Sequence, residues 1–164
     1  MSRSNWLQEL SWGDVRDYLE RNDLILLPVG STEQHSLCLP LGTDAYAAIR
    51  MAEDAAKRTG VLLAPPLWFG WSPHHLAWPG TISVRPETLT ALVTEMAMSL
   101  IYHGFNRIII VNGHRVTNLP PLQVAAARVR HETGAYVAVV DPIYIGDTVS
   151  RKLLTGPPGC VGHA

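Results

Sequence analysis

Short apolar runs of strand length alternate along this chain with longer segments whose apolar residues follow a helical pattern. The first run, 24–30, is continuously apolar, and further runs occupy 61–66, 107–112 and 135–140. Continuous apolar runs are typical of strands buried on both faces, as in a parallel sheet. Their alternation with helical patterns predicts an α/β fold, a three-layer αβα arrangement with a mostly parallel sheet of about four strands.

Capping residues mark the expected helices between these runs. Ser11 is a candidate N-cap, Pro86 suits a first helical position, and Gly60 and Gly134 are natural C-terminal caps. At 164 residues the chain fits one ordinary domain over residues 1–164. We expect helices over 12–22, 44–59, 86–103 and 119–133.

The composition narrows the range of partners. The chain is 47% hydrophobic and 16% charged, with a formal net charge of −1 and no run of Lys or Arg. This excludes a polybasic nucleic-acid groove or membrane patch and favours small molecules or other protein chains. No apolar run approaches a membrane span, and Cys38 and Cys160 fit neither a zinc pattern nor a secreted disulfide framework. We therefore expect a reduced, cytoplasmic protein.

Side chains with metal-binding chemistry follow three of the predicted strands. In open parallel sheets, ligands bind beyond the carboxyl ends of the strands, so we expect these side chains to converge at one edge. His103 and His131 lie near helix ends on the opposite edge, and we assign them no site role. The candidates are Glu33 and His35 after the first run, Ser72, His74 and His75 after the second, and Asn112 and His114 after the third.

The segment 31–44 contains the densest group of candidate ligands. Zinc and similar ions take neutral His nitrogen and Asp or Glu oxygen, and Glu33 and His35 can aim at a common centre. Asp44, at the first turn of the next helix, can reach the same point. Other interpretations stay open at this stage, because Asp44 or Thr43 can cap that helix and Glu33 can be a solvated loop residue.

Longer motifs in this chain resemble the creatininase (creatinine amidohydrolase) family. The resemblance runs in order through most of the chain and includes three successive motifs, with the start of a fourth at the end. The matching segments are LPVGSTEQH at 27–35 with LPLGTD at 39–44, GWSPHHLAWPGT at 70–81, IVNGH at 110–114 and GHA at 162–164.

The resemblance implies a metal-dependent amidohydrolase with a binuclear site. Such an enzyme hydrolyses a C–N bond of a cyclic amide, an imide or a related small amide, with two Zn²⁺ or Mn²⁺ ions per complete site. Carried over by position, Glu33 and His114 hold one ion, His35 holds the other, and Asp44 bridges both. Two metals can share a hydroxide and lower its pKa, so that it attacks a polarised carbonyl carbon.

Proton transfer and substrate binding can be assigned more loosely. By resemblance, His163 or His75 carries a proton to the leaving nitrogen. Indole rings in the loop 67–84 can pack against a flat substrate, although each can equally anchor the loop to the core. Arg115 either meets a substrate carboxylate or faces solvent or a subunit interface. The candidate substrate-binding residues are Ser72, Trp71, Trp78 and Arg115.

Several positions depart from the family pattern. Val116 stands where creatininase has a Glu two residues after the motif's His, and Val cannot bind a metal. Ser36 replaces a common Gly, and Cys38 replaces a common His. For Cys38 we favour a buried small hydrophobe over a metal ligand.

The last departure concerns the end of the chain. Relatives with a similar Gly-His-Ala continue with acidic residues and a further section of the domain, whereas this sequence stops at Ala164. We therefore expect a second polypeptide to complete the domain, with one carboxylate for the second metal, in an oligomer or heteromer. The alternative is a non-catalytic or regulatory subunit that supports an active partner. A nucleotide-binding Rossmann domain is excluded, since no GxGxxG follows the first run.

Overall fold

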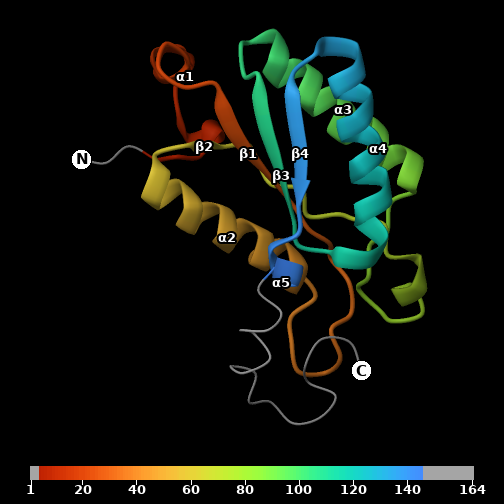
Figure 1. Ribbon diagram of the computed structural model, residues 1–164. Helices are drawn as coiled ribbons and strands as arrows, with labels where there is room; N and C mark the ends of the chain where they lie inside the picture. The colour runs from red at the N-terminus through yellow and green to blue at the C-terminus, as the bar shows by residue number, and fades with distance from the viewer. Residues whose placement is uncertain (1–3, 146–164) are drawn as a thin grey trace.

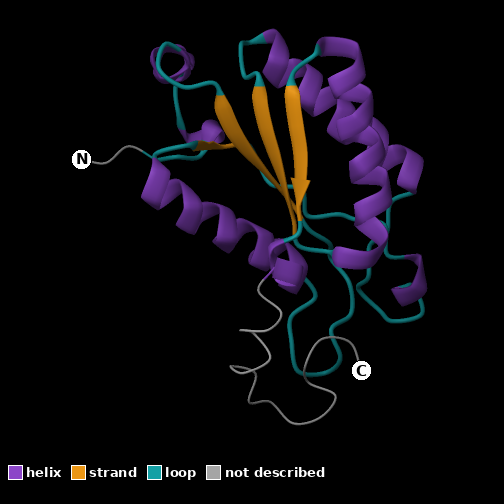
Figure 2. Ribbon diagram, viewed as in Figure 1, coloured by secondary structure: helices purple, strands orange, loops and turns teal. Residues whose placement is uncertain are grey.

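The parallel sheet predicted from the apolar runs is present in the computed structural model, which describes residues 4–145 (Figures 1 and 2). Its strands are all parallel and lie in the order β2-β1-β3-β4. Leu26, in the middle of β1, pairs with Leu63 on one side and Ile109 on the other. The strands are β1 (Leu24–Val29), β2 (Leu62–Leu63), β3 (Arg107–Asn112) and β4 (Tyr136–Val140).

The edge strand β2 is shorter than its apolar run, 61–66, predicted. Ala64 still donates its N–H to the carbonyl of Leu26 at 2.8 Å, but Pro65 and Pro66 follow. Proline has no N–H to give to a strand ladder, so pairing ends there. The chain then leaves the sheet for the long loop that leads to α3.

Helices cover both faces of the sheet, which gives the predicted three layers. α2 lies against one face, and α3 and α4 pack on each other against the opposite face (Figure 1). Among the described residues, none of the helices combines the length and apolar character needed to cross a membrane. The helices are α1 (Trp12–Leu19), α2 (Thr43–Thr59), α3 (Pro86–Tyr102), α4 (Arg115–Thr133) and the short α5 (Pro142–Ile145), with 3-10 turns at Leu7–Glu9 and Pro73–His75.

The predicted caps are found at four helix ends. Ser11 and Asp14 form a capping box at the start of α1, in which the Ser11 hydroxyl accepts from the Asp14 N–H at 3.3 Å. Gly60 and Gly134 close α2 and α4 with φ angles of 73° and 74°, in the left-handed region that glycine adopts without strain.

α4 begins at Arg115, four residues before the predicted start at 119. Proline is best tolerated in the first turn of a helix. In the structure both prolines lie inside the helix, and Pro121 is buried. The Thr90 hydroxyl of α3 donates to the Pro121 carbonyl at 3.2 Å, so packing between the two helices supports this segment.

Alternate side chains of the strands point to opposite faces of the sheet and belong to two separate apolar layers. Ile25, Leu27 and Ile110 belong to the larger layer, beneath α3 and α4. Leu26 and Val111 belong to the smaller one, which includes alanines of α2. Small alanines let α2 approach the sheet closely, and this approach brings the first turn of α2 to the ends of β1 and β3.

Candidate metal centre

Three strand-end loops and the first turn of α2 meet at the carboxyl edge of the sheet. This is the edge to which the β4 arrow points in Figure 1. β1 leads to Glu33 and His35, β3 leads to His114, and Asp44 lies in the first turn of α2. All four side chains are buried. The convergence predicted from parallel strand direction is therefore found, and it includes all four predicted metal ligands.

Two glycines allow α2 to come this close. A Cβ on Gly113 would lie 2.1 Å from the carbonyl oxygen of Asp44, and a Cβ on Gly30 would lie 2.3 Å from the Cα of Ala45. No side chain fits at such distances without a shift of the backbone. Gly30 and Gly113 follow β1 and β3 directly, so the start of α2 packs closely against the ends of both strands.

Asp44 lies between two histidines. Its Oδ1 is 3.0 Å from Nε2 of His35, and its Oδ2 is 2.8 Å from Nδ1 of His114. Burial acts to raise the pKa of Asp44, but the hydrogen bonds and charges of His114 and His35 outweigh burial and hold that pKa below its usual value. The N-cap of α2 is Gly42, without a side-chain cap. Asp44 therefore faces the histidines and does not serve as a helix cap.

The ring of His35 is held in the orientation that metal-binding histidines use. Its Nδ1 lies 3.1 Å from the backbone carbonyl of Glu33, which can only accept, so Nδ1 carries a proton. Burial acts to lower the pKa of His35, but the hydrogen bonds and charges of Asp44 and Glu33 together outweigh burial, and the pKa lies above its usual value. A metal ion at Nε2 would take the place of a proton there, with the carbonyl contact as its outer-shell support.

Glu33 is fully buried at the centre of the group. One of its oxygens, Oε2, accepts from the Ser31 hydroxyl at 3.1 Å. The Ser31 hydroxyl lies 2.6 Å from that of Ser72. The other oxygen, Oε1, is 3.3 Å from Nδ1 of His114 and 3.7 Å from Nε2 of His75. The carboxylate is therefore held by a hydroxyl on one side and faces two imidazoles on the other.

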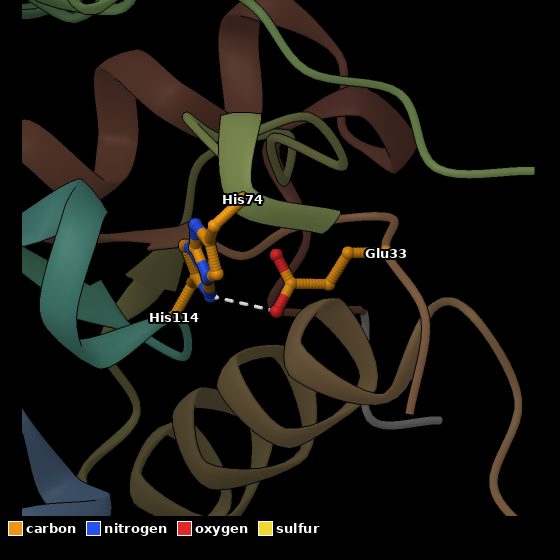
Figure 3. A group of neighbouring side chains, drawn as sticks. All are labelled: Glu33, His74 and His114. Atoms are coloured by element: carbon orange, nitrogen blue, oxygen red, sulfur yellow. Dashed lines mark ion pairs between the residues drawn. The ribbon is translucent and has the colours of Figure 1, made fainter. Parts of the chain in front are cut away.

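The described residues provide two sets of side chains that could each hold a metal ion. One set is Glu33, His35 and Asp44, and the other is Glu33, His74 and His114 (Figure 3). Within each set the ligand atoms lie within 4.8 Å of one another. Carboxylate oxygen and imidazole nitrogen suit zinc and other first-row ions, so the donors present fit a metal centre. His74 had been placed at this edge by the sequence, but the motif gave it no role.

His75 is the buried histidine of the long loop, and its hydrogen bonds fix the position of its proton. The Ser36 N–H donates to Oε1 of Gln34 at 2.9 Å, so the amide of Gln34 presents its NH₂ to Nδ1 of His75, at 2.8 Å. Since Nδ1 accepts there, neutral His75 carries its proton on Nε2, which faces Glu33. His75 can therefore donate a proton toward the centre of the site.

The predicted substrate-binding residues differ in how they lie. Ser72 is fully buried, with its hydroxyl 3.4 Å from Nε2 of His114. Trp71 is half-buried, and Trp78 is exposed with its ring edge-on to His75, the centroids 5.7 Å apart. Arg115 is exposed, and its Nε lies 3.7 Å from Oδ2 of Asp141 beyond β4. None of these contacts tests a role in substrate binding.

The remaining predictions at this edge have separate outcomes. Cys38 is exposed, so its interpretation as a buried hydrophobe is wrong: residues 37–41 all lie on the surface. Val116 is 77% exposed and offers no ligand atom. His163 lies outside the described residues, and its role stays a prediction.

Sequence reasoning missed Thr117. Its hydroxyl lies 2.5 Å from Nε2 of His114, so it supports that ring from the side opposite Asp44. Spacing contained a signal for this contact, because Thr117 lies three residues after His114, at the first turn of α4. The helix was expected to begin later, so the two residues were not placed together.

Comparison with known protein families gives a match over nearly the whole chain. The family model described as creatinine amidohydrolase matches residues 8–164. This range includes every segment that builds the edge described above.

Individual relatives have different activities. A 3-dehydro-scyllo-inosose hydrolase of Thermotoga maritima is 35% identical over 73% of this chain and 39% of its own length. A creatinine amidohydrolase of Pseudomonas putida is 32% identical over 70% of this chain and 46% of its own length. A mycofactocin precursor peptide peptidase of Mycolicibacterium smegmatis is 37% identical over 66% and 46%. The chain thus spans less than half the length of these relatives.

Solved structures share the fold. The Mn form of creatininase superposes with a TM-score of 0.85 at 26% identity and covers 96% of this chain and 66% of that one. A mutant creatininase of the Zn-Zn type gives a TM-score of 0.79 at 26% identity, over 97% and 67%.

Proposed function

Because the chain belongs to the creatininase (creatinine amidohydrolase) family, we propose that it is a metal-dependent amidohydrolase whose metal ligands are Glu33, His35, Asp44 and His114. One observation carries the proposal. Asp44 is buried with one carboxylate oxygen against His35 and the other against His114, which is the arrangement a bridging ligand needs. The fully buried Glu33 lies beside the same imidazole of His114.

The bound metals are two divalent ions, Zn²⁺ or Mn²⁺. Solved family members occur in Zn-Zn and Mn forms, and mixed oxygen and nitrogen donors suit either ion. When bound, such ions polarise a carbonyl oxygen and lower the pKa of water toward neutrality. The four ligands hold them at the end of the sheet, where burial strengthens every electrostatic contact.

The substrate is a small cyclic amide, an imide or a related amide, and the bond broken is its C–N bond. His75, with its proton on Nε2, donates to the leaving nitrogen. His163 is the second candidate for the same proton transfer. Ser72, Trp71, Trp78 and Arg115 position the substrate around this centre. A relative that is a peptide peptidase makes peptides the necessary comparison in any substrate screen.

The test combines metal content with hydrolysis. We expect the purified protein to contain close to two ions per chain and to open small cyclic amides or imides. Asp44→Asn keeps the shape of the side chain but removes its charge, and should weaken metal binding by more than about 100-fold, since outer-shell partners alone are worth about 10–100-fold. Asp54→Asn is the matched control, because Asp54 lies half-exposed on the same helix and pairs with Arg50.

Three results would count against this proposal. They are a protein that holds no metal above background, hydrolysis that survives Asp44→Asn, and equal losses in both Asp variants.

A non-catalytic or regulatory role is the second candidate, favoured by Val116 in place of a carboxylate. In that case the protein binds metal, hydrolyses no amide alone, and raises the activity of a partner. The second polypeptide expected from the sequence stays a prediction, and metal analysis after co-expression with neighbouring genes tests it.

A further inference from the structure

His74 lies at the metal centre although no motif assigns it a role. It belongs to the 3-10 turn Pro73–His75 in the loop between β2 and α3, and its side chain is exposed. Its ring is parallel to that of His114, with an interplanar angle of 10° and centroids 6.1 Å apart. Figure 3 shows the two rings on one side of the group and the Glu33 carboxylate facing them from the other.

We propose that His74 is a direct metal ligand, which with Glu33 and His114 forms a position of two imidazoles and one carboxylate. The inference rests on the proposed function, since it needs a metal at Glu33. The three ligand atoms lie within 4.8 Å of one another. In tetrahedral coordination with bonds of about 2.0–2.1 Å, the ligand atoms of zinc lie about 3.4 Å apart. The exposed His74 ring therefore has at most about 1.4 Å to close.

The backbone below His74 is held in place while its side chain is left movable. Ser72 donates its N–H to the Ser83 hydroxyl at 2.8 Å, and its own hydroxyl meets that of Ser31. Pro73 restricts the first position of the turn. His74 thus projects from an anchored turn, and its exposed side chain contacts the ring of His75, with the centroids 4.0 Å apart.

This ligand changes which metal the site prefers. Imidazole suits zinc, whereas carboxylate and water suit manganese. Without His74, the centre has two carboxylates and two imidazoles, and Val116 adds none. With His74, three of five ligands are imidazoles. The nitrogen-rich position at Glu33 and His114 should accordingly select Zn²⁺ over Mn²⁺.

The experiment measures the dissociation constants of Zn²⁺ and Mn²⁺ separately, by competition with a chromophoric chelator. His74→Ala should weaken Zn²⁺ binding by more than about 100-fold, since outer-shell partners alone are worth about 10–100-fold, and Mn²⁺ binding by less. His74→Glu should shift the preference toward Mn²⁺. His103→Ala, which removes an exposed histidine at the opposite edge, should leave both constants unchanged. In protein loaded with Co²⁺, His74→Ala should also change the visible absorption of the metal.

The outcomes separate the two proposals. If the unaltered protein binds Zn²⁺ and His74→Ala binds it with the same constant and the same Co²⁺ spectrum, the role of His74 is wrong and the proposed function stands. If the unaltered protein binds none of the three metals, both fail. Because the His74 side chain is exposed, the variant should keep the circular dichroism and urea midpoint of the metal-free protein.

Discussion

At the carboxyl end of the sheet the chain buries carboxylates and imidazoles, whereas at the amino end it buries an aromatic and aliphatic group. Glu33 is fully buried at the first end, and Phe105 is 1% exposed at the second. The amino end also carries a hollow of about 790 Å³ lined mainly by apolar side chains of α1 and its neighbours, including Leu19 and Phe105. Apolar side chains are thus buried at one end, and the candidate metal ligands at the other.

At the carboxyl end, burial of polar groups costs free energy unless each group finds a hydrogen-bond or charge partner. At the amino end, the Tyr18 hydroxyl donates to the Leu24 carbonyl at 2.6 Å, and its ring packs 6.2 Å from that of Phe105. Changes at the amino end should therefore alter folding alone, and changes at the carboxyl end should alter metal binding.

The largest expected effect is that of Phe105→Ala at the amino end. Removal of this buried ring should lower the free energy of unfolding by about 3–5 kcal/mol, because the loss of apolar burial is joined by the cost of a cavity. Urea unfolding of the metal-free protein measures this value, with Phe105→Leu as a milder control. Zn²⁺ affinity of the folded fraction should not change, and a change would show that the two ends are coupled.

Gly113→Ala comes next and acts at the carboxyl end. The added Cβ meets the Asp44 carbonyl at 2.1 Å, so the start of α2 must move. We expect a loss of about 1–3 kcal/mol in stability, as for other overpacked sites, together with weaker Zn²⁺ binding by calorimetry. Gly60→Ala is the control: it strains a left-handed cap without a clash and should leave Zn²⁺ binding intact. Equal Zn²⁺ constants in both variants would contradict the claim that close packing of α2 at Gly113 positions the metal ligands.

The pH dependence of the metal-free protein should differ between the two ends. His35 has a raised pKa, so it stabilises the folded protein fully below pH about 6.5, the usual His value. This stabilisation is lost as the pH rises through the raised pKa. Asp44 has a lowered pKa, so it stabilises the folded protein fully above pH about 3.9, the usual Asp value. This stabilisation is lost as the pH falls through the lowered pKa. The carboxyl end should therefore be most stable between the usual pKa values of Asp and His.

At the amino end, burial raises the pKa of Tyr18. Tyr18 therefore stabilises the folded protein fully below pH about 10, the usual Tyr value. This stabilisation is lost as the pH rises through the raised pKa. Urea midpoints measured from pH 3 to 11 with a chelator present test both ends. Asp44→Asn should flatten the acidic side and also remove much of the His35 contribution to the pH dependence, since Asp44 raises the pKa of His35. Tyr18→Phe should flatten the alkaline side alone, and the reverse assignment would show that the linkage is wrong.

Ser36→Gly should have the smallest effect. Ser36 has a φ of 57°, in the left-handed region that favours glycine. Relief of the strain should stabilise the metal-free protein by about 1 kcal/mol or less, since the entropy of the unfolded chain offsets part of it. Ser36→Ala keeps the Cβ and should give no gain. A gain of equal size in both variants would place its cause outside the backbone strain.

The sequence predicted the strands well because their apolar runs are continuous. It predicted the ends of two helices because glycine caps follow them. β3 begins and ends at the residues expected, and Gly60 and Gly134 end their helices as predicted. The predicted end of α1 at 22, the start of α4 and the length of β2 were wrong, since α1 ends at Leu19. In α4, packing accommodates prolines inside the helix, and at β2, prolines lack the N–H donors that a longer strand needs. Local patterns alone cannot weigh those two effects.

By itself, the sequence determined the parallel sheet, the edge at which its loops converge, and four candidate ligands. Strand direction alone requires that convergence. Only the tertiary structure decided that Asp44 faces His35 and His114 and does not cap α2, because this depends on how closely Gly30 and Gly113 admit the helix. It also brought His74 to Glu33 and His114, since a long loop can be placed only by its contacts.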